Sequence, residues 1–204
     1  MFEYQQYEDF VPIGDQKVIH DFMHEKMPWK YVENISGVSP KQINIYEELP
    51  VAKYQNGFTG FIHSDALGWV TNEDAVSAVS PLIKKIHETF PFPVEIIRIR
   101  GGLFTNCGFD WGVHVPHVDA FFPHYTVLYY VNDSDGDTFL YNEKAPVVDV
   151  GVVPEYPDMF NVAASFAPKM GRALIFNGLT YHSSSPPQLT SHRIAININV
   201  VPKS

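Results

Sequence analysis

The sequence contains a single cysteine, few charged residues and no long hydrophobic run. Cys107 has no partner for an internal disulfide, which fits a protein of a reducing compartment. Charged residues make up 18% of the 204 positions and hydrophobic residues 45%, a composition typical of one folded domain rather than a disordered chain. No segment approaches the roughly 20 apolar residues of a membrane-spanning helix, and the acidic, aromatic start is unlike a signal peptide. We therefore expect a cytoplasmic protein without a membrane role.

Positive charge is also scarce. The chain has 14 Lys and Arg against 23 Asp and Glu, for a formal net charge of −9. An overall field of that sign repels the phosphate backbone of nucleic acids and anionic lipid surfaces. We therefore do not expect nucleic acid to be a partner.

Two amphipathic helices are predicted in the first part of the chain, over residues 15–27 and 72–90. The first begins with Asp15 as its N-cap and places Val18, Phe22 and Met23 at helical spacing on one apolar face. The apolar face of the second consists of Val76, Val79, Leu82, Ile83 and Ile86. Each face needs a partner to cover it, so both helices are expected to pack on a sheet.

Short runs rich in β-branched and aromatic residues follow the second helix. They cover residues 94–100, 125–131, 137–141, 160–166, 172–177 and 192–201. Two helices followed by many antiparallel-looking strands predict a mostly β (α+β) domain. In such a domain the helices lie on one outer face of a sandwich or barrel.

The last of these runs has two different faces, because side chains alternate along a strand. The apolar face consists of Ile194, Ile196, Ile198 and Val200. The opposite face consists of Arg193, Ala195, Asn197 and Asn199. A polar face within a domain indicates a cavity, and the apolar face is expected to lie against the helices.

A metal site is indicated by three residues. His117 and Asp119 are two positions apart and point the same way on an extended segment, and His182 follows 65 residues after His117. Two imidazoles and one carboxylate leave three positions of an octahedral ion open, the arrangement of non-haem Fe(II) oxygenases. His-x-Asp alone also occurs by chance in surface turns. His114 and His124 lack a carboxylate two residues further on, so we interpret them as supporting or surface residues.

A co-substrate site is indicated beside the metal. Arg193 lies eleven residues after His182 and faces the predicted cavity. A guanidinium can hold a carboxylate by two parallel hydrogen bonds, and a dicarboxylate could also chelate iron with its other end. Tyr129 is our candidate for a second hydrogen-bond donor to the same carboxylate. The alternative for Arg193 is an ordinary ion pair with an Asp inside the sandwich.

These motifs resemble the 2-oxoglutarate/Fe(II) dioxygenases, in particular their prolyl-hydroxylase-like branch, and they are also similar to small oxygenases of cyanophages. The resemblance covers about residues 94–201. It consists of the segments HVD, YTVLYYVND, GDTFLYNE, GRALIFNGLTYH and HRIAININV. The ordered combination is specific, although each segment alone is not.

The resemblance implies a double-stranded β-helix of the jelly-roll or cupin type, with N-terminal helices packed on the major sheet. Residues 1–204 would form a single domain, with 1–92 as a helical or mixed support region and 93–204 as the catalytic core. The implied iron ligands are His117, Asp119 and His182. The implied contacts to 2-oxoglutarate are Arg193 and Tyr129, and further cavity-lining candidates are Asn197 and Asn199.

The implied activity is hydroxylation of a C–H bond with Fe(II), 2-oxoglutarate and O2, releasing succinate and CO2, with ascorbate as a reductant. A peptide or protein substrate is favoured over a small molecule, and candidate substrate loops are residues 105–116, with Phe109 and Trp111, and 145–168. The family often has a Tyr near the position of Cys107, and the absence of that Tyr here weakens the assignment of a prolyl substrate. The alternatives are a β-sandwich binding module with a structural metal such as zinc and a catalytically silent interaction protein.

Overall fold

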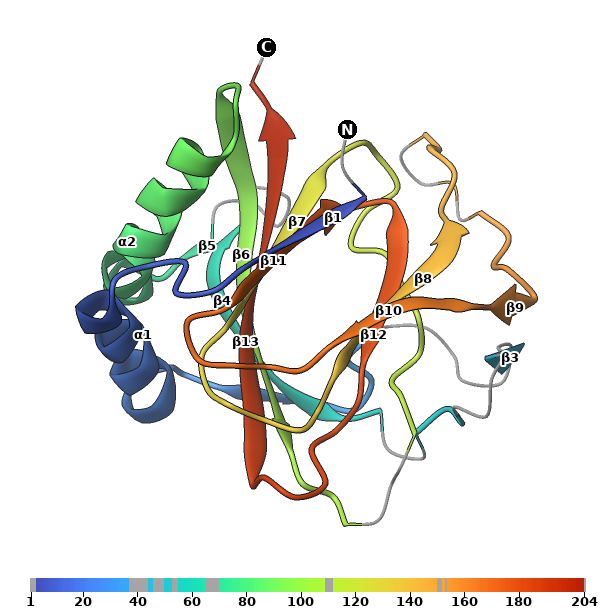
Figure 1. Cartoon of the computed structure of the whole chain (residues 1–204), viewed down its shortest axis with the longest axis horizontal. Coiled ribbons are helices and arrows are strands. Elements are labelled where there is room, and N and C mark those ends of the chain that lie inside the picture. Colours follow the sequence, from blue (N-terminus) through green and yellow to red (C-terminus); the bar gives the residue numbers. More distant parts are fainter. Residues whose placement is uncertain are drawn as a thin grey trace.

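The β-branched and aromatic runs of the sequence form two antiparallel sheets that face each other, and two helices cover the outer face of the larger sheet (Figure 1). The computed structural model of the chain describes residues 3–36, 44–45, 50–52, 55–64, 70–108, 112–149, 152 and 154–203. This arrangement is the predicted mostly β domain with its helices packed on the major sheet.

Within the described ranges, the larger sheet has eight strands in the order β1-β11-β7-β13-β6-β4-β2, with β5 paired to β4. Their bounds are β1 (Tyr4–Tyr7), β2 (Lys30–Val32), β4 (Gly57–Ser64), β5 (Val70–Thr71), β6 (Val94–Thr105), β7 (Tyr125–Tyr130), β11 (Ala173–Asn177) and β13 (His192–Pro202). The sequence patterns predicted β6, β7, β11 and β13. They did not predict the four strands from the first 92 residues, which lie at both edges of this sheet.

The smaller sheet has the order β10-β8-β12. Its strands are β8 (Thr138–Lys144), β10 (Val162–Phe166) and β12 (Thr180–Ser184), and a separate parallel pair joins β3 (Asn44–Ile45) to β9 (Met159–Phe160). Apolar side chains of both sheets meet between them. Strand β12 carries His182, one of the three predicted metal ligands.

Helix α1 (Ile13–Glu25) differs from its prediction at two points. Its N-cap is Pro12, and Asp15 lies in the first turn without a capping hydrogen bond. Ile19 and Met23 are fully buried against the sheet, whereas Val18 is 52% exposed. One residue corresponds to about 100° around a helix, so a face centred on Ile19 and Met23 turns Val18 toward solvent.

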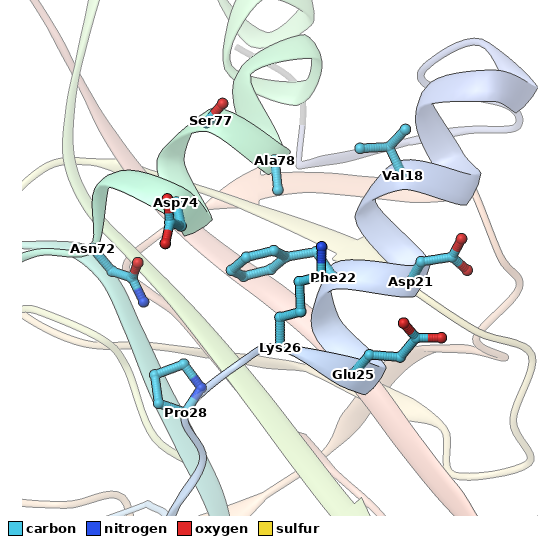
Figure 2. A pocket seen from close by; sticks show the side chains of 10 residues that line it. All are labelled: Val18, Asp21, Phe22, Glu25, Lys26, Pro28, Asn72, Asp74, Ser77 and Ala78. Carbon is cyan, nitrogen blue, oxygen red and sulfur yellow. The ribbon is translucent and has the colours of Figure 1, made fainter.

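An open groove separates α1 from α2 (Glu73–Thr89), and Figure 2 shows its lining. The ring of Phe22 extends from α1 toward α2, and Val18 lies on the α1 side of the groove. Asp21 and Glu25 also border it, so the groove is partly acidic. The second prediction for α1, that Val18 packs on the sheet, is therefore wrong because its side chain lines this open groove.

Helix α2 forms as predicted. The side chain of Asn72 accepts a hydrogen bond from the backbone N–H of Ala75 at 3.1 Å, which caps the first turn. Val79, Leu82 and Ile86 are fully buried in the core between the helices and the larger sheet. In the described part of the chain, neither helix is long and apolar enough to cross a bilayer.

Strand β13 lies between β6 and β7 near the centre of the larger sheet, and its two faces have the predicted roles. Ile194, Ile196, Ile198 and Val200 belong to the core under the helices. On the opposite face, Arg193, Ala195 and Asn197 line a cavity between the two sheets. The alternation in the sequence thus located the cavity correctly.

The turn that leads into β13 is held by one carboxylate. Asp135 accepts hydrogen bonds from the backbone N–H groups of Gln188, Leu189 and Thr190, at 3.0, 2.7 and 3.0 Å, and from the Thr190 hydroxyl at 2.6 Å. Burial opposes the ionisation of Asp135, but these hydrogen bonds hold its pKa below the ordinary value. The position of Arg193, three residues after Thr190, is thereby fixed.

Candidate metal and co-substrate site

The three predicted metal ligands converge. His117 lies in the segment before β7, and His182 is the central residue of β12. One ligand atom from each of His117, Asp119 and His182 lies within 4.8 Å of the others. The two histidines are paired through their main chains, with N–H···O distances of 3.0 and 2.9 Å. We call these three residues the His–Asp–His site.

Both imidazoles are oriented by main-chain carbonyl groups. The Nδ1 atom of His117 lies 3.1 Å from the carbonyl oxygen of Val115, and that of His182 lies 3.3 Å from the carbonyl oxygen of Thr180. A carbonyl only accepts, so Nδ1 must be the protonated nitrogen in each neutral ring. The Nε2 lone pairs are then available to an ion. Among the described residues, the buried Nε2 of His182 has no hydrogen-bond partner.

The carboxylate of Asp119 is held by four donors. Arg98 on β6 forms an ion pair with it. The side-chain amides of Asn197 and Asn199 donate to Oδ2 at 3.0 Å each, and the Thr126 hydroxyl lies 3.4 Å from the same atom. Both asparagines predicted to line the co-substrate site thus contact the acidic metal ligand, and Asn197 also lines the cavity. Such contacts fix the orientation of a ligand and its ionised state.

Charges in this site are shifted in the direction that suits metal binding. Burial lowers the pKa of His117 to about 3, and burial also lowers the pKa of His182. Burial opposes ionisation of Asp119, but Arg98 and the neighbouring histidines hold its pKa well below the ordinary value. The protein therefore presents two neutral imidazoles and one carboxylate at neutral pH.

These shifts predict an unusual pH dependence of metal binding. Protons should compete for His117 only near pH 3 and for His182 only below the ordinary histidine value of about 6.5, so the affinity for Mn²⁺ is expected to begin to fall at a lower pH than it would with ordinary histidine ligands. The apo protein should nevertheless lose stability as the pH falls below about 6.5, because the unfolded histidines take up protons that the folded ones do not. Mn²⁺ titrations and thermal melts across pH 5–8 measure both quantities. A tenfold loss of affinity per pH unit beginning at 6.5 would contradict the prediction.

Arg193 is buried, with 3% of its surface exposed, in the cavity that His117 and His182 also line. Its guanidinium donates to the Thr138 hydroxyl at 2.8 Å and lies over the rings of Phe104 and Tyr130, at 5.5 and 5.7 Å. In the described part of the chain, no acidic group lies within ion-pair distance of Arg193, and its Nε has no hydrogen-bond partner. A buried guanidinium in this state fits an anionic ligand.

The prediction for Tyr129 is wrong. Its ring belongs to the core under the helices, next to Ile196 of β13, and it therefore points away from the cavity. The adjacent Tyr130 has the orientation that was predicted for Tyr129, because its ring lies on the side of the sheet that carries Arg193. Its hydroxyl donates a hydrogen bond to the Thr138 hydroxyl at 2.9 Å. Strand alternation separated the two tyrosines correctly, but we chose the wrong face. The pairing of Tyr129 with Ile196, on the apolar face of β13, was the signal that could have placed Tyr129 on the helix side of the sheet.

Several cavity residues were missed by sequence reasoning. Residues at alternate positions of β6 face the cavity side of the sheet, namely Arg98, Arg100, Gly102 and Phe104. The period-two pattern of arginines in this strand was the available signal. Phe109 and Trp111, the predicted substrate-loop residues, lie outside the described residues.

The two neighbouring histidines are buried, with 1% of His114 and 3% of His124 exposed, so a surface position is excluded. His114 lines the cavity, with its Nδ1 3.0 Å from the Ser184 hydroxyl. His124 contacts the main-chain carbonyl of Phe122 through Nδ1 at 2.8 Å. Neither belongs to the His–Asp–His site, in agreement with the supporting role predicted for them.

The sequence matches no protein-family model and no curated protein. Its structure is similar to those of known oxygenases. An oxidoreductase of the 2OG-Fe(II) oxygenase family from Burkholderia pseudomallei has a TM-score of 0.62 and 13% identity, over 97% of this chain and 85% of that one. A prolyl hydroxylase from Trichoplax adhaerens, in complex with a hypoxia-inducible-factor peptide fragment, has a TM-score of 0.55 and 15% identity, over 98% and 84%.

A third similar structure is HygX from Streptomyces hygroscopicus with nickel, 2-oxoglutarate and hygromycin B bound. Its TM-score is 0.54 and its identity 12%, over 98% of this chain and 83% of that one. The three structures share a fold with this chain along almost its whole length. The chain therefore has the fold of the 2-oxoglutarate/Fe(II) oxygenases, the double-stranded β-helix, with a His–Asp–His site in its cavity.

Proposed function

We propose that this chain is a 2-oxoglutarate- and Fe(II)-dependent dioxygenase that hydroxylates a C–H bond of an organic substrate. The observation that carries the proposal is the combination of two groups in one cavity. A His–Asp–His site has its Nε2 atoms available, and a buried arginine beside it has no acidic group within ion-pair distance in the described part of the chain, where Asp137 attracts it only from farther away. A closed structural metal site would need no such arginine.

The residues fit Fe(II) and 2-oxoglutarate. His117, Asp119 and His182 would hold the ion, and Arg193 together with the Thr138 hydroxyl would hold the carboxylate of 2-oxoglutarate farther from it. When bound, these groups supply O2 activation coupled to the conversion of 2-oxoglutarate into succinate and CO2. The protein contributes fixed ligand orientations and a buried cavity that restricts water.

The substrate is a peptide, a protein or a small molecule. Among the similar structures, the Trichoplax enzyme is in complex with a peptide fragment and HygX has hygromycin B bound, so the fold accommodates both classes. The segments 105–116 and 145–168, the second of which also contains β9 and β10, are rich in aromatic and proline residues, and this composition supports a peptide substrate. We therefore place a peptide first.

Anaerobic addition of Fe(II) and 2-oxoglutarate tests this function. The wild-type protein is expected to develop the weak visible charge-transfer band of the ternary complex, and His117→Ala is expected to show none. Succinate release upon admission of O2, with ascorbate present to keep the iron reduced, extends the test to turnover. A wild-type protein that binds Zn²⁺ tightly but gives no band with Fe(II) and 2-oxoglutarate would instead identify a metal-binding interaction module.

A further inference from the structure

A second arginine faces the cavity. Arg100 lies on β6 opposite Asn197 of β13, on the same side of the sheet as Phe104 and Arg193. It lines the cavity together with His117 and His182. The proposed function assigns a role to Arg193 and none to Arg100, although both arginines surround the same space.

Arg100 has no counter-charge of its own. The acidic residue of this cavity is Asp119, which is already bound by Arg98, Asn197 and Asn199. Among the described residues, the guanidinium of Arg100 forms neither a hydrogen bond nor an ion pair, and Asp119 attracts it only from beyond ion-pair distance. Arginine keeps its charge in proteins, so a half-buried guanidinium in this state is stabilised by an anion from outside the chain.

That anion is not 2-oxoglutarate if the proposed function holds, and the present inference rests on that function. One carboxylate of 2-oxoglutarate would chelate the metal and the other would bind Arg193, so none is left for Arg100. Arg100 and Arg193 are also separated along the sheet. Their pairing partners on the neighbouring strands are four residues apart, which corresponds to about 13 Å.

The charges in the loaded cavity lead to the same conclusion. The negative charge of Asp119 offsets the positive charge of Arg98. One carboxylate of bound 2-oxoglutarate would offset the charge of Arg193. The other carboxylate neutralises only half of the Fe²⁺ charge. One metal charge and the charge of Arg100 therefore remain, in a buried space where uncompensated charge is costly. A carboxylate of the substrate would offset one of these two positive charges, although the whole protein is acidic.

We propose that Arg100 binds a carboxylate of the primary substrate and thereby selects acidic substrates. The planar guanidinium can hold a carboxylate through two hydrogen bonds, which fixes direction as well as position. A carboxylate held beside the His–Asp–His site would place the neighbouring carbon atoms of the same molecule next to the metal. The oxidised C–H bond then lies within a few bonds of the acid group.

The test uses [¹³C]formate, the smallest carboxylate, with the protein loaded with Mn²⁺ and 2-oxoglutarate under conditions without turnover. Relaxation of the ¹³C signal by Mn²⁺ reports formate bound in the cavity. We expect saturable relaxation in the wild type, binding at least tenfold weaker in Arg100→Gln, and partial recovery in Arg100→Lys. Arg172→Gln is the matched control, because Arg172 pairs with Glu8 outside the cavity.

Equal formate relaxation in wild type and Arg100→Gln would overturn the proposal, because formate would then bind the metal directly. A wild type that binds Mn²⁺ and 2-oxoglutarate but shows no saturable relaxation would overturn it as well. Failure to bind Mn²⁺ and 2-oxoglutarate at all would be a failure of the proposed function instead, and the band measurement identifies that case. Displacement of formate by N-acetylglycine indicates a free acid as substrate, and displacement by N-acetylaspartic acid α-methylamide, which keeps the side-chain acid, indicates an acidic peptide.

Discussion

Asp119→Ala is expected to abolish metal binding and to destabilise the apo protein at the same time. The substitution removes the carboxylate ligand itself. We expect the metal affinity to fall by at least about 100-fold, because even residues that only hydrogen-bond a metal ligand contribute 10- to 100-fold to metal affinity. It also leaves Arg98, whose side chain is only 20% exposed, without its ion-pair partner. Removing one member of a buried pair costs about 3–5 kcal/mol, which corresponds to a melting temperature lowered by roughly 6–20 °C.

Mn²⁺ titration and thermal melting of the apo protein measure the two effects. Asp21→Ala is the matched control, because Asp21 pairs with Lys17 on the surface of α1, and little change is expected from its removal. His182→Ala should lose the metal without comparable destabilisation, because it leaves no charge unpaired. If Asp119→Ala melts at the wild-type temperature, the ion pair with Arg98 does not contribute to the stability of the apo protein.

Arg193→Met is expected to weaken 2-oxoglutarate binding strongly while leaving metal binding and folding intact. Loss of a buried charge-assisted contact weakens binding by about 2–5 kcal/mol, or roughly 30-fold to a few thousandfold. The apo protein should be as stable as the wild type or more stable, because the buried guanidinium has one hydrogen bond to Thr138 and no ion-pair partner among the described residues. A side chain that serves only the fold would behave in the opposite way.

The Fe(II)/2-oxoglutarate band, Mn²⁺ affinity and apo melting temperature together decide this prediction. Tyr129→Phe is the control, because Tyr129 lies under the helices and its hydroxyl should not affect 2-oxoglutarate affinity. Unchanged 2-oxoglutarate affinity in Arg193→Met would assign the co-substrate to another group. A large loss of apo stability would indicate that Arg193 is structural.

The features that the sequence predicted best are those with a local period. Alternation along residues 192–201 separated the apolar face from the cavity face, and helical spacing located α2. The metal ligands could be grouped because a His-x-Asp pair requires a third ligand. His182, which directly follows a strand-like segment, supplied that third ligand to His117 and Asp119. These predictions depend on short-range geometry that a single sequence contains.

The predictions that failed depended on long-range pairing. Alternation distinguishes Tyr129 from Tyr130 but does not say which face meets the helices, and that is decided by the neighbour β13. Arg98 and Arg100 were overlooked because β6 was recognised as a strand without its register against β13. Strands β1, β2 and β4 have weak patterns of their own, and they form because the larger sheet offers them edges to pair with.

The direct main-chain pairing of His117 with His182 sets the separation of the two imidazoles without help from an ion. The ligands therefore do not have to assemble around the metal, as they do in small domains that are unfolded without it. If the proposed function holds, loss of the iron would therefore leave the protein folded. Under the proposed function, activity would then return when iron is supplied again, without refolding of the protein.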